Sequence, residues 1–324
     1  MAKVSQKQIA EKLGVSIALV SRVLSGKAEE IGITPATIQR VLKTAAEMGY
    51  VPSAAALSLK GKPTRTVGVA VYDFNDPFFG ALIRQIQTEA HRHNYSLVLA
   101  GFLNRVPTEQ DLQPLHKHFI DGLIILGSDM NAPWLNDFKK FPVARIGHGA
   151  GNEHSLRVAI DETDAAQQLI THLKTRRIKK IICPEDNLPV HRLRCDALTA
   201  AAKAAGIQTG SLPPADCEPF SAGESAVEKI RQKPLPENCA VVCINDQFAM
   251  GLIHELIAAG ISVPQQICVT GFDDIPAAAQ FIPALTTIQQ PITQMVQRAF
   301  QHILKPEPLK SVYLSGRLVV RESA

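Results

Sequence analysis

Side chains between residues 16 and 22 have the types and spacing needed to read DNA. Ser16, Ile17, Ala18, Ser21 and Arg22 fall on one face of a short helical pattern. Arg can contact guanine or phosphate, Ser can contact phosphate or a base edge, and small apolar groups can touch thymine methyls. The residues therefore predict a helix that enters a major groove. The alternative is an ordinary helical hairpin within a globular core.

The flanking residues predict the elements that would position this face. Ile9, Ala10 and Leu13 have the spacing of one helix face, and Gly14 suits the positive φ that ends a helix. Ser16 is a suitable N-cap for the next helix. That second helix has its own apolar face, made of Val20, Val23 and Leu24. A small residue, a turn glycine and a buried valine at these intervals predict a helix-turn-helix.

A third helix should follow, because Thr34 can cap it and Pro35 suits its first position. The Ala-rich stretch 53–60 comes after Gly49-Tyr-Val-Pro52. It is too short to form a stable helix alone in water, and it could fold on meeting DNA and a partner copy.

Residues 15–24 and 49–59 resemble the DNA-binding domain and hinge of the LacI/GalR family of bacterial transcriptional regulators. The resemblance implies a homodimer on a near-palindromic operator, with Leu59 wedged into the minor groove and Ala56 packed close to it. Leu19 departs from the family, which often has a phosphate-contacting Thr there, and the 27–33 connection is longer than usual. The expected DNA contacts are Ser5, Gln6, Lys7, Ser16, Ile17, Ala18, Ser21, Arg22, Ala56, Leu59 and Lys60.

Composition is that of a globular protein with a basic head. The chain has 324 residues, 46% hydrophobic and 20% charged, and a net charge of +4. Residues 1–62 hold nine Lys and Arg against four Glu, so the excess charge lies in the head, as expected for a DNA-binding segment. No apolar signal segment or stretch long enough to span a membrane is present, which predicts a cytoplasmic protein without a membrane partner.

Six cysteines are scattered between positions 183 and 268 without a C-x-x-C pair. Several of them, such as Cys183, Cys243 and Cys268, sit in apolar strand-like runs. The sequence therefore predicts buried free thiols, and neither a disulfide nor a metal site nor a cofactor. The basic run 176–180 falls in a helix-to-strand turn, where a solvated turn is expected rather than a phosphate site.

From residue 66 the pattern changes to alternating strands and helices, beginning with the buried run 67–71. Two strings of such units predict two doubly wound parallel-sheet subdomains, with ligands bound at the carboxyl ends of the strands. The segments 75–79, 244–251, 269–275 and 283–291 resemble the periplasmic-binding-protein-like core of the same family. The expected fold is an all-α helix-turn-helix head plus this α/β core.

The expected domains follow the same division. Residues 1–52 form the head, 53–63 the hinge helix and linker, and 64–324 the core for effector binding and dimerisation. Subdomain 1 covers about 64–161 plus 291–318, and subdomain 2 covers about 162–290 plus 319–324.

Candidate effector contacts follow the strands of this core. Asn245 and Asp273 suit the reading of sugar hydroxyls, and helix capping is their alternative role. The family resemblance implies that the Arg194 guanidinium forms a bidentate hydrogen bond with a ligand, that Phe220 stacks on the ligand and that His148 contacts it. The complete expected set is Phe78, Phe79, Ser128, Asp129, His148, Arg194, Phe220, Asn245, Asp273 and Gln289.

These features predict a repressor whose operator affinity is switched by a small-molecule effector, a sugar or related metabolite. A sugar-binding protein without a DNA-binding role is the main rival, but it leaves residues 1–62 unexplained. A Rossmann-type enzyme is the second rival. No G-x-G-x-x-G follows the first strand, and no Walker motif or nucleophile–His–Asp set is present, so catalysis is not expected.

Overall fold

The computed structural model describes residues 4–28, 32–51, 62–102, 105–117, 119–127, 133–149, 155–185, 188–213, 218–232, 235–306, 308 and 311–324. The chain divides into two compact units, Met1–Thr64 and Arg65–Ala324. We call them the head and the core and describe each by itself. Within the described part of the chain, no helix combines the length and apolar character that crossing a membrane requires.

The head contains three helices, α1 (Gln6–Leu13), α2 (Ile17–Leu24) and α3 (Pro35–Glu47). Gly14 ends α1 at a φ of 65°, and the Ser16 hydroxyl caps α2 by accepting from the Leu19 backbone N–H at 3.1 Å. These are the turn and the cap that the sequence predicts. The three helices enclose one small apolar core, formed by Ile9, Ala10, Val20, Val23, Ala28, Val41 and Ala45.

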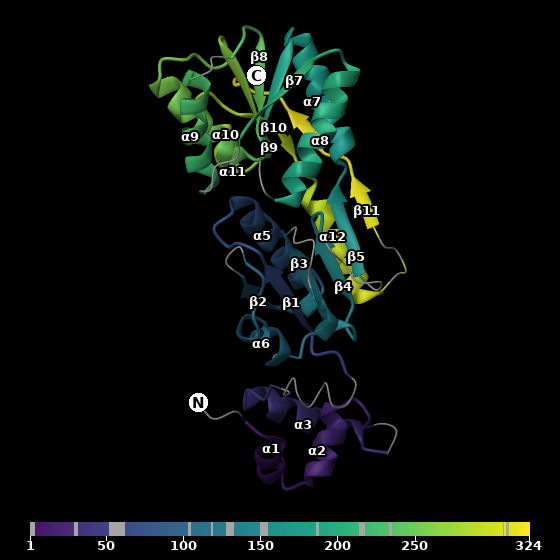
Figure 1. The fold of residues 1–324 in the computed structure, drawn as a ribbon. Helices are drawn as coiled ribbons and strands as arrows, with labels where there is room; N and C mark the ends of the chain where they lie inside the picture. Colours follow the sequence, from purple (N-terminus) through teal and green to yellow (C-terminus); the bar gives the residue numbers. More distant parts are fainter. Residues whose placement is uncertain are drawn as a thin grey trace. The chain divides into compact units, whose positions relative to one another are not determined.

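The first lobe of the core is a six-stranded parallel sheet in the order β11-β5-β4-β3-β1-β2. Its strands are β1 (Thr66–Val71), β2 (Ser96–Gly101), β3 (Gly122–Leu126), β4 (Val143–Ile146), β5 (Ser155–Ile160) and β11 (Ser311–Leu314). Its helical segments are α5 (Pro77–Arg92), α6 (Glu109–Lys117), the 3-10 helix η2 (Pro133–Phe138) and α12 (Ile292–Leu304). Figure 1 shows α12 lying along β4 and β5, although it follows them by more than a hundred residues.

The second lobe is a six-stranded sheet in the order β12-β10-β9-β8-β6-β7. Its strands are β6 (Lys180–Pro184), β7 (Gln208–Leu212), β8 (Cys239–Val242), β9 (Ile267–Asp273), β10 (Thr286–Gln289) and β12 (Arg317–Val319). Its helices are α7 (Glu162–Thr175), α8 (Pro189–Ala204), α9 (Pro219–Gln232), α10 (Asp246–Ala258) and α11 (Pro276–Gln280). Both lobes therefore have the doubly wound parallel arrangement expected from the sequence.

The chain passes between the lobes three times, after β5, after β10 and between β11 and β12. The last two strands belong to different lobes, because β11 pairs parallel with β5 and β12 pairs antiparallel with β10. The strands β7 and β10 were not predicted, since both are short and each has a single large apolar residue, Leu212 in β7 and Ile288 in β10.

Helices α9 and α10 pack closely through glycines. A Cβ added at Gly251 of α10 would lie 2.0 Å from the carbonyl oxygen of Phe220, and one at Gly223 of α9 would lie 2.1 Å from that of Phe248. Backbone atoms cannot move aside as a flexible side chain can. The close helix crossing therefore depends on both glycines.

We expect Gly251→Ala to lower the free energy of unfolding by roughly 1–3 kcal/mol through overpacking. The matched control is Gly80→Ala in α5, where an added Cβ meets nothing within 4 Å. That control should be neutral or slightly stabilising, because alanine is the better helix former. Urea denaturation followed by circular dichroism measures both changes. Equal effects of the two substitutions would contradict the packing argument.

Candidate functional site

The predicted DNA-reading face of α2 lies on the surface of the head. Ile17 is 48% exposed, although it is a large apolar residue, and Ser16, Ala18 and Arg22 are also exposed. Val20 on the same helix is buried in the head core. Ser21, the remaining predicted contact on α2, is half-buried. The helix therefore separates a packed face from a free face, as a recognition helix requires.

The predicted contacts at the start of α1 also have structural roles. Ser5 forms a capping box, in which its backbone N–H donates to Gln8 Oε1 at 2.8 Å. Gln6 donates through Nε2 to the Tyr50 hydroxyl at 2.9 Å, which ties α1 to the end of α3. Lys7 is exposed and lies 3.9 Å from the Glu11 carboxylate. An exposed pair of this kind is weak and leaves Lys7 available to a phosphate.

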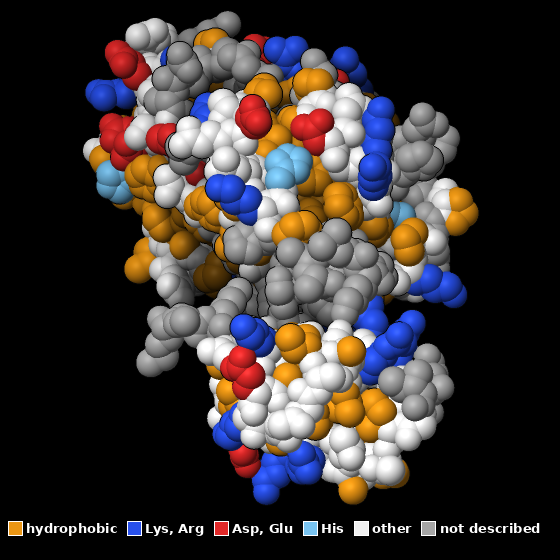
Figure 2. Space-filling view, turned by 90° about the horizontal axis from the view of Figure 1, so that it is seen from below, with side chains coloured by type: hydrophobic (Ala, Val, Ile, Leu, Met, Phe, Trp, Pro, Cys, Tyr) orange, Lys and Arg blue, Asp and Glu red, His pale blue; other side chains and the backbone are white. Residues whose placement is uncertain are grey.

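Several predicted DNA contacts fall outside the described residues, namely Ala56, Leu59 and Lys60. Part of the 27–33 connection lies outside them too. Leu19 is half-buried against the head core, which accounts for an apolar residue at this position. Figure 2 shows Lys and Arg side chains at separate places on the visible face, where the described ones form no single continuous patch.

The core holds a cavity of about 80 Å³ between the ends of strands from both lobes. The first lobe contributes residues after β3 and β4 and from the start of α5, and the second contributes residues from α8 and after β8 and β9. This is where doubly wound sheets bind ligands. The lining residues are Asp76, Phe78, Phe79, Gly127, Ile146, Gly147, His148, Ile160, Val190, His191, Arg194, Asn245, Asp273 and Gln290.

Arg194 is the most strongly held side chain of the cavity. Its Nε and Nη2 donate to the two carboxylate oxygens of Glu162, at 3.0 and 2.9 Å, and its Nη1 donates to the Ile244 carbonyl oxygen. The guanidinium also lies 3.4 Å from the centre of the Phe272 ring. Burial opposes the charged form, but Glu162 outweighs it and keeps the pKa of Arg194 above its ordinary value. The Arg194–Glu162 pair thus joins α8 to the start of α7.

His148 follows β4 and presents an imidazole nitrogen to the same region. Its Nε2 is buried without a hydrogen-bond partner and lies 3.6 Å from Glu162 Oε1. Burial lowers the pKa of His148, and the neighbouring Arg194 charge lowers it further, whereas Glu162 acts in the opposite direction. A neutral ring with a free buried nitrogen can bond a ligand hydroxyl.

Asn245 and Asp273 are both in the cavity wall. Asn245 is the N-cap of α10, where its Oδ1 accepts from the Phe248 N–H at 2.8 Å, so the capping alternative is realised. Its amide nitrogen remains for a ligand. Asp273 ends β9 at a φ of 113°, and its Oδ1 accepts from Gln290 Nε2 at 2.6 Å. Burial raises the pKa of Asp273 well above its ordinary value, although the nearby Arg194 lowers it.

Two predicted contacts lie elsewhere. The Phe220 ring is tilted against His254 at 6.1 Å and packs on the core of the second lobe, because the first turn of α9 faces α10. Gln289 lies outside the cavity lining, where its side chain donates a hydrogen bond to Asp274 and accepts one from Arg317. The next residue, Gln290, lines the cavity instead. Ser128 and Asp129 fall outside the described residues.

Sequence reasoning missed Asp76, His191 and Gln290 in the cavity wall. Asp76 belongs to the Asn75–Phe79 segment that was recognised, and it caps α5 through a 2.8 Å bond from the Phe78 N–H. Burial raises its pKa. Its place in a motif directly after a strand could have identified it. No local signal distinguishes Gln290 from Gln289.

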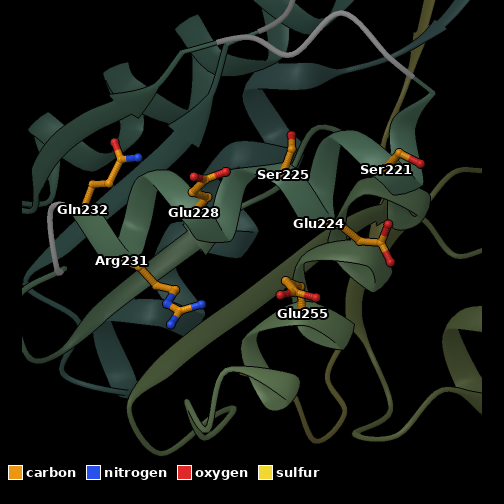
Figure 3. A pocket seen from close by; sticks show the side chains of 7 residues that line it. All are labelled: Ser221, Glu224, Ser225, Glu228, Arg231, Gln232 and Glu255. Carbon is orange, nitrogen blue, oxygen red and sulfur yellow. The ribbon is translucent and has the colours of Figure 1, made fainter.

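A larger hollow of about 670 Å³ lies on the outer side of the second lobe, along α9 and α10 (Figure 3). We call it the α9 groove. Its lining is polar and largely acidic, made of Ser221, Glu224, Ser225, Glu228, Arg231, Gln232 and Glu255. It is open to solvent and lacks the apolar walls typical of small-molecule sites. The smaller cavity between the lobes is therefore the better ligand site.

Comparisons with known proteins agree with this geometry. The model for "Bacterial regulatory proteins, lacI family" matches residues 6–53, and the periplasmic binding protein-like domain model matches residues 170–324. The ribose operon repressor of Escherichia coli (strain K12) is 31% identical, over 93% of this chain and 92% of its own length. The chain belongs to the LacI family.

Solved structures support the LacI-family fold over the whole chain. The lac repressor dimer bound to operator and the anti-inducer ONPF matches with a TM-score of 0.83, at 22% identity and 99% coverage of both chains. A LacI family regulator from Enterococcus faecalis V583 with bound ribose matches with a TM-score of 0.68, at 25% identity over 80% of this chain and 98% of its own. The family and the fold predicted from the sequence are thus confirmed.

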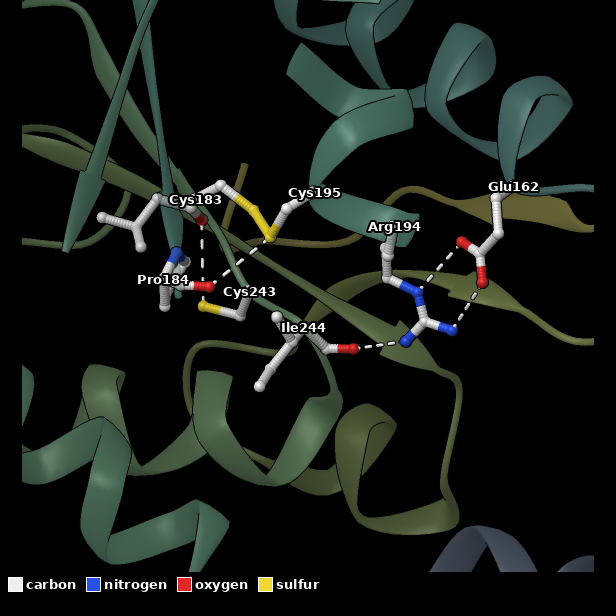
Figure 4. The surroundings of a disulfide bond; sticks show 8 residues. Glu162, Cys183, Pro184, Arg194, Cys195, Cys243 and Ile244 are labelled. Carbon is white, nitrogen blue, oxygen red and sulfur yellow. Dashed lines mark hydrogen bonds and ion pairs between the residues drawn. A yellow bond between two sulfur atoms is a disulfide. The ribbon is translucent and has the colours of Figure 1, made fainter. Parts of the chain in front are cut away.

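The prediction that the cysteines are free thiols was wrong for Cys183 and Cys195. They form a disulfide, with Cα atoms 6.0 Å apart, because the second turn of α8 packs back on the end of β6. Figure 4 shows this disulfide beside the Arg194–Glu162 pair. Cys239, Cys243 and Cys268 are buried and free, as predicted, and Cys217 lies outside the described residues. Among the described residues, no group of His, Cys, Asp and Glu could hold a metal ion.

Burial of Asp246 should make the stability of this LacI-family core depend on pH. Burial raises its pKa from 3.8 to about 7, although bonds from Thr287 Oγ1 and the Ile275 N–H oppose the rise. Between pH 4 and 7 the unfolded chain therefore loses a proton that the folded protein keeps. The folded state binds more protons, so stability falls as pH rises through this window, by about 1.4 kcal/mol per pH unit for one such group.

We expect Asp246→Asn to remove this part of the slope, so that the free energy of unfolding falls less steeply from pH 4 to 7. Part of the slope should remain, because burial also raises the pKa of Asp76 and of Asp273. The control is Asp137→Asn, which changes an exposed carboxylate. Urea denaturation at several pH values measures the slopes. An unchanged slope in Asp246→Asn would contradict the assignment.

Proposed function

We propose that this chain is a cytoplasmic transcriptional repressor that binds operator DNA as a homodimer and changes its DNA affinity when a small sugar or related metabolite binds in the core. The observation that carries the proposal is the combination, in one LacI-family chain, of an exposed α2 face with a cavity between the two lobes that aromatic and polar side chains line. The relatives support it, since one is a ribose operon repressor and another structure contains bound ribose.

The DNA-binding step rests on the exposed face of α2. Arg22 supplies a guanidinium for guanine or phosphate, Ser16 a hydroxyl, and Ile17 and Ala18 apolar contacts for thymine methyls. The sequence adds the hinge leucine, Leu59, as a minor-groove wedge at the centre of the operator. A dimer would present two copies of α2 to two half-sites. The lac repressor dimer bound to operator, which shares the fold, supports this arrangement.

The effector step rests on the wall of the inter-lobe cavity. Phe78 and Phe79 form an apolar surface with ring centres 5.9 Å apart, and one ring face can stack on a sugar. His148, Asn245 and Asp273 add polar groups that converge from both lobes. An apolar wall with a few placed polar groups is the usual composition of a small-molecule site.

The small volume of the cavity suggests that ligand binding is coupled to a movement of the two lobes. Its volume of about 80 Å³ is below the roughly 300–1,000 Å³ of typical ligand pockets. A sugar would therefore enter a more open arrangement of the lobes, and the three chain crossings are where the lobes can turn. A ligand that binds one arrangement better shifts the population toward it. Residues 53–60, which the sequence predicts as the hinge and which lie outside the described part of the chain, would transmit this change to the DNA-binding heads.

A sugar-binding protein without a DNA-binding role is the alternative. It accounts for the core, but it gives no reason for an exposed isoleucine and arginine on α2 or for the lacI-family match over residues 6–53. A repressor function accounts for both the head and the core.

The test is selection of bound fragments from the source genome with the purified full-length protein. We expect enrichment of an inverted repeat of roughly twenty base pairs with a flexible pyrimidine–purine step at its centre. Affinity for that repeat should fall steeply with salt concentration. Selection that enriches no sequence, with and without a mixture of sugars, would contradict the proposal.

A further inference from the structure

The Arg194 guanidinium lines the effector cavity, and its bidentate Nε/Nη2 edge is already bound to a carboxylate. Two of its nitrogens bind both oxygens of Glu162, and the third binds the Ile244 carbonyl. Both side chains are more than 90% buried. The two-pronged arrangement is the one in which arginine recognises a carboxylate or phosphate. An internal carboxylate therefore already binds the edge of Arg194 that would best bind an anionic ligand.

The rest of the cavity wall offers little to a negative charge. Arg194 is the only Lys or Arg among the described lining residues, and Glu162 neutralises it. Asp76 and Asp273 contribute two half-buried carboxyls, and His148 and His191 are the other titratable groups. Bringing a phosphate or carboxylate into this site would require its desolvation without a free cation, which costs several kcal/mol.

We propose that Glu162 determines the ligand specificity of this pocket. By binding the bidentate edge of the Arg194 guanidinium, it restricts the effector to uncharged polyhydroxylated molecules and excludes phosphorylated and carboxylated ones. The inference rests on the proposed function, because it concerns the same cavity. It adds the charge class of the effector and the residue that sets it. Glu162 is the first residue of α7 and lies outside the cavity lining, so it acts through Arg194 and is a positioning residue.

The remaining polar groups fit hydroxyl groups. The carboxyl groups of Asp76 and Asp273 can accept from hydroxyls and, when protonated, donate to them. His148 Nε2 lacks a hydrogen-bond partner, and the Asn245 amide can donate. Since hydroxyls both donate and accept, a neutral ring with several hydroxyls can satisfy all of these groups together.

The test compares matched ligands by isothermal titration calorimetry on the full-length protein without DNA. The probes are ribose and glucose, their phosphate esters ribose 5-phosphate and glucose 6-phosphate, and their acids ribonate and gluconate. The wild type should bind at least one neutral sugar and bind the matching anions at least a hundredfold more weakly. Glu162→Gln keeps the shape but removes the charge, so it should improve anion binding at least tenfold relative to the neutral sugar.

Two further variants separate specificity from folding. Glu162→Asp keeps the negative charge and should keep the neutral preference. Glu224→Gln makes the same chemical change in the α9 groove and should leave the ratio of neutral to anionic affinity unchanged. Circular dichroism checks that each variant is folded.

Three outcomes would overturn the inference. They are wild-type binding of an anion as tight as that of its neutral counterpart, an unchanged affinity ratio in Glu162→Gln, and binding of no neutral sugar by the wild type. The proposed function is tested separately, by DNA selection, because the affinity ratio is measured without DNA. A repressor that binds its operator but prefers an anionic effector would therefore overturn the role of Glu162 alone.

Discussion

Replacing Arg194 by Ala should lower the free energy of unfolding of the core by roughly 3–5 kcal/mol. The cost arises because the Glu162 carboxylate would remain buried, at 8% exposure, without its partner. The variant also loses the bond to the Ile244 carbonyl and the contact with the Phe272 ring. Urea denaturation followed by circular dichroism measures the change.

Two companion variants make this prediction sharper. Arg192→Ala changes an exposed arginine on the same helix and should cost less than about 1 kcal/mol. The double variant Arg194→Ala with Glu162→Ala should be more stable than Arg194→Ala alone, because both charges have been removed. If the double variant is no more stable than Arg194→Ala alone, the unpaired Glu162 carboxylate is not the source of the cost.

Replacing Arg22 by Ala should weaken operator binding by roughly 1–3 kcal/mol, which is about 5- to 150-fold. The side chain lies on the exposed face of α2, so the fold of the head should not change. If Arg22 contacts a phosphate, the slope of log affinity against log salt should fall by about one. If it contacts a guanine, the slope should hold and discrimination at one base pair should be lost.

The matched control is Lys43→Ala, which removes an exposed positive charge from α3 of the same head. Its effect on operator affinity should be small. Fluorescence anisotropy with a labelled operator at several salt concentrations measures both variants. Equal losses for Arg22→Ala and Lys43→Ala would mean that the head binds DNA through general charge, without a recognition helix.

The helices of the head and the alternation of strands and helices in the core could be predicted from the sequence because they depend on local signals. Gly14 and Ser16 mark a turn and a cap by their residue types alone, and the structure contains both. The buried run at 67–71 lies within β1, as predicted, since it is a continuous apolar run of strand length.

The features that could not be predicted depend on contacts between distant residues. Cys183 and Cys195 meet because α8 folds back on β6, which residue spacing does not reveal. The pairing of Glu162 with Arg194 joins residues 32 positions apart. The exchange of Gln289 for Gln290 in the cavity wall is a shift of one residue at the end of β10, and the alternation of a short strand is too brief to set it.

The most direct test of the account is whether ligand binding in the core changes operator affinity. The measurement is anisotropy of the selected operator with full-length protein, with and without the neutral sugar that binds most tightly by calorimetry. We predict at least a tenfold change in operator affinity at saturating sugar, and loss of this change when Asn245 and Asp273 are replaced by Ala. A sugar that binds the cavity and leaves operator affinity unchanged would contradict the central claim that one chain couples the two sites.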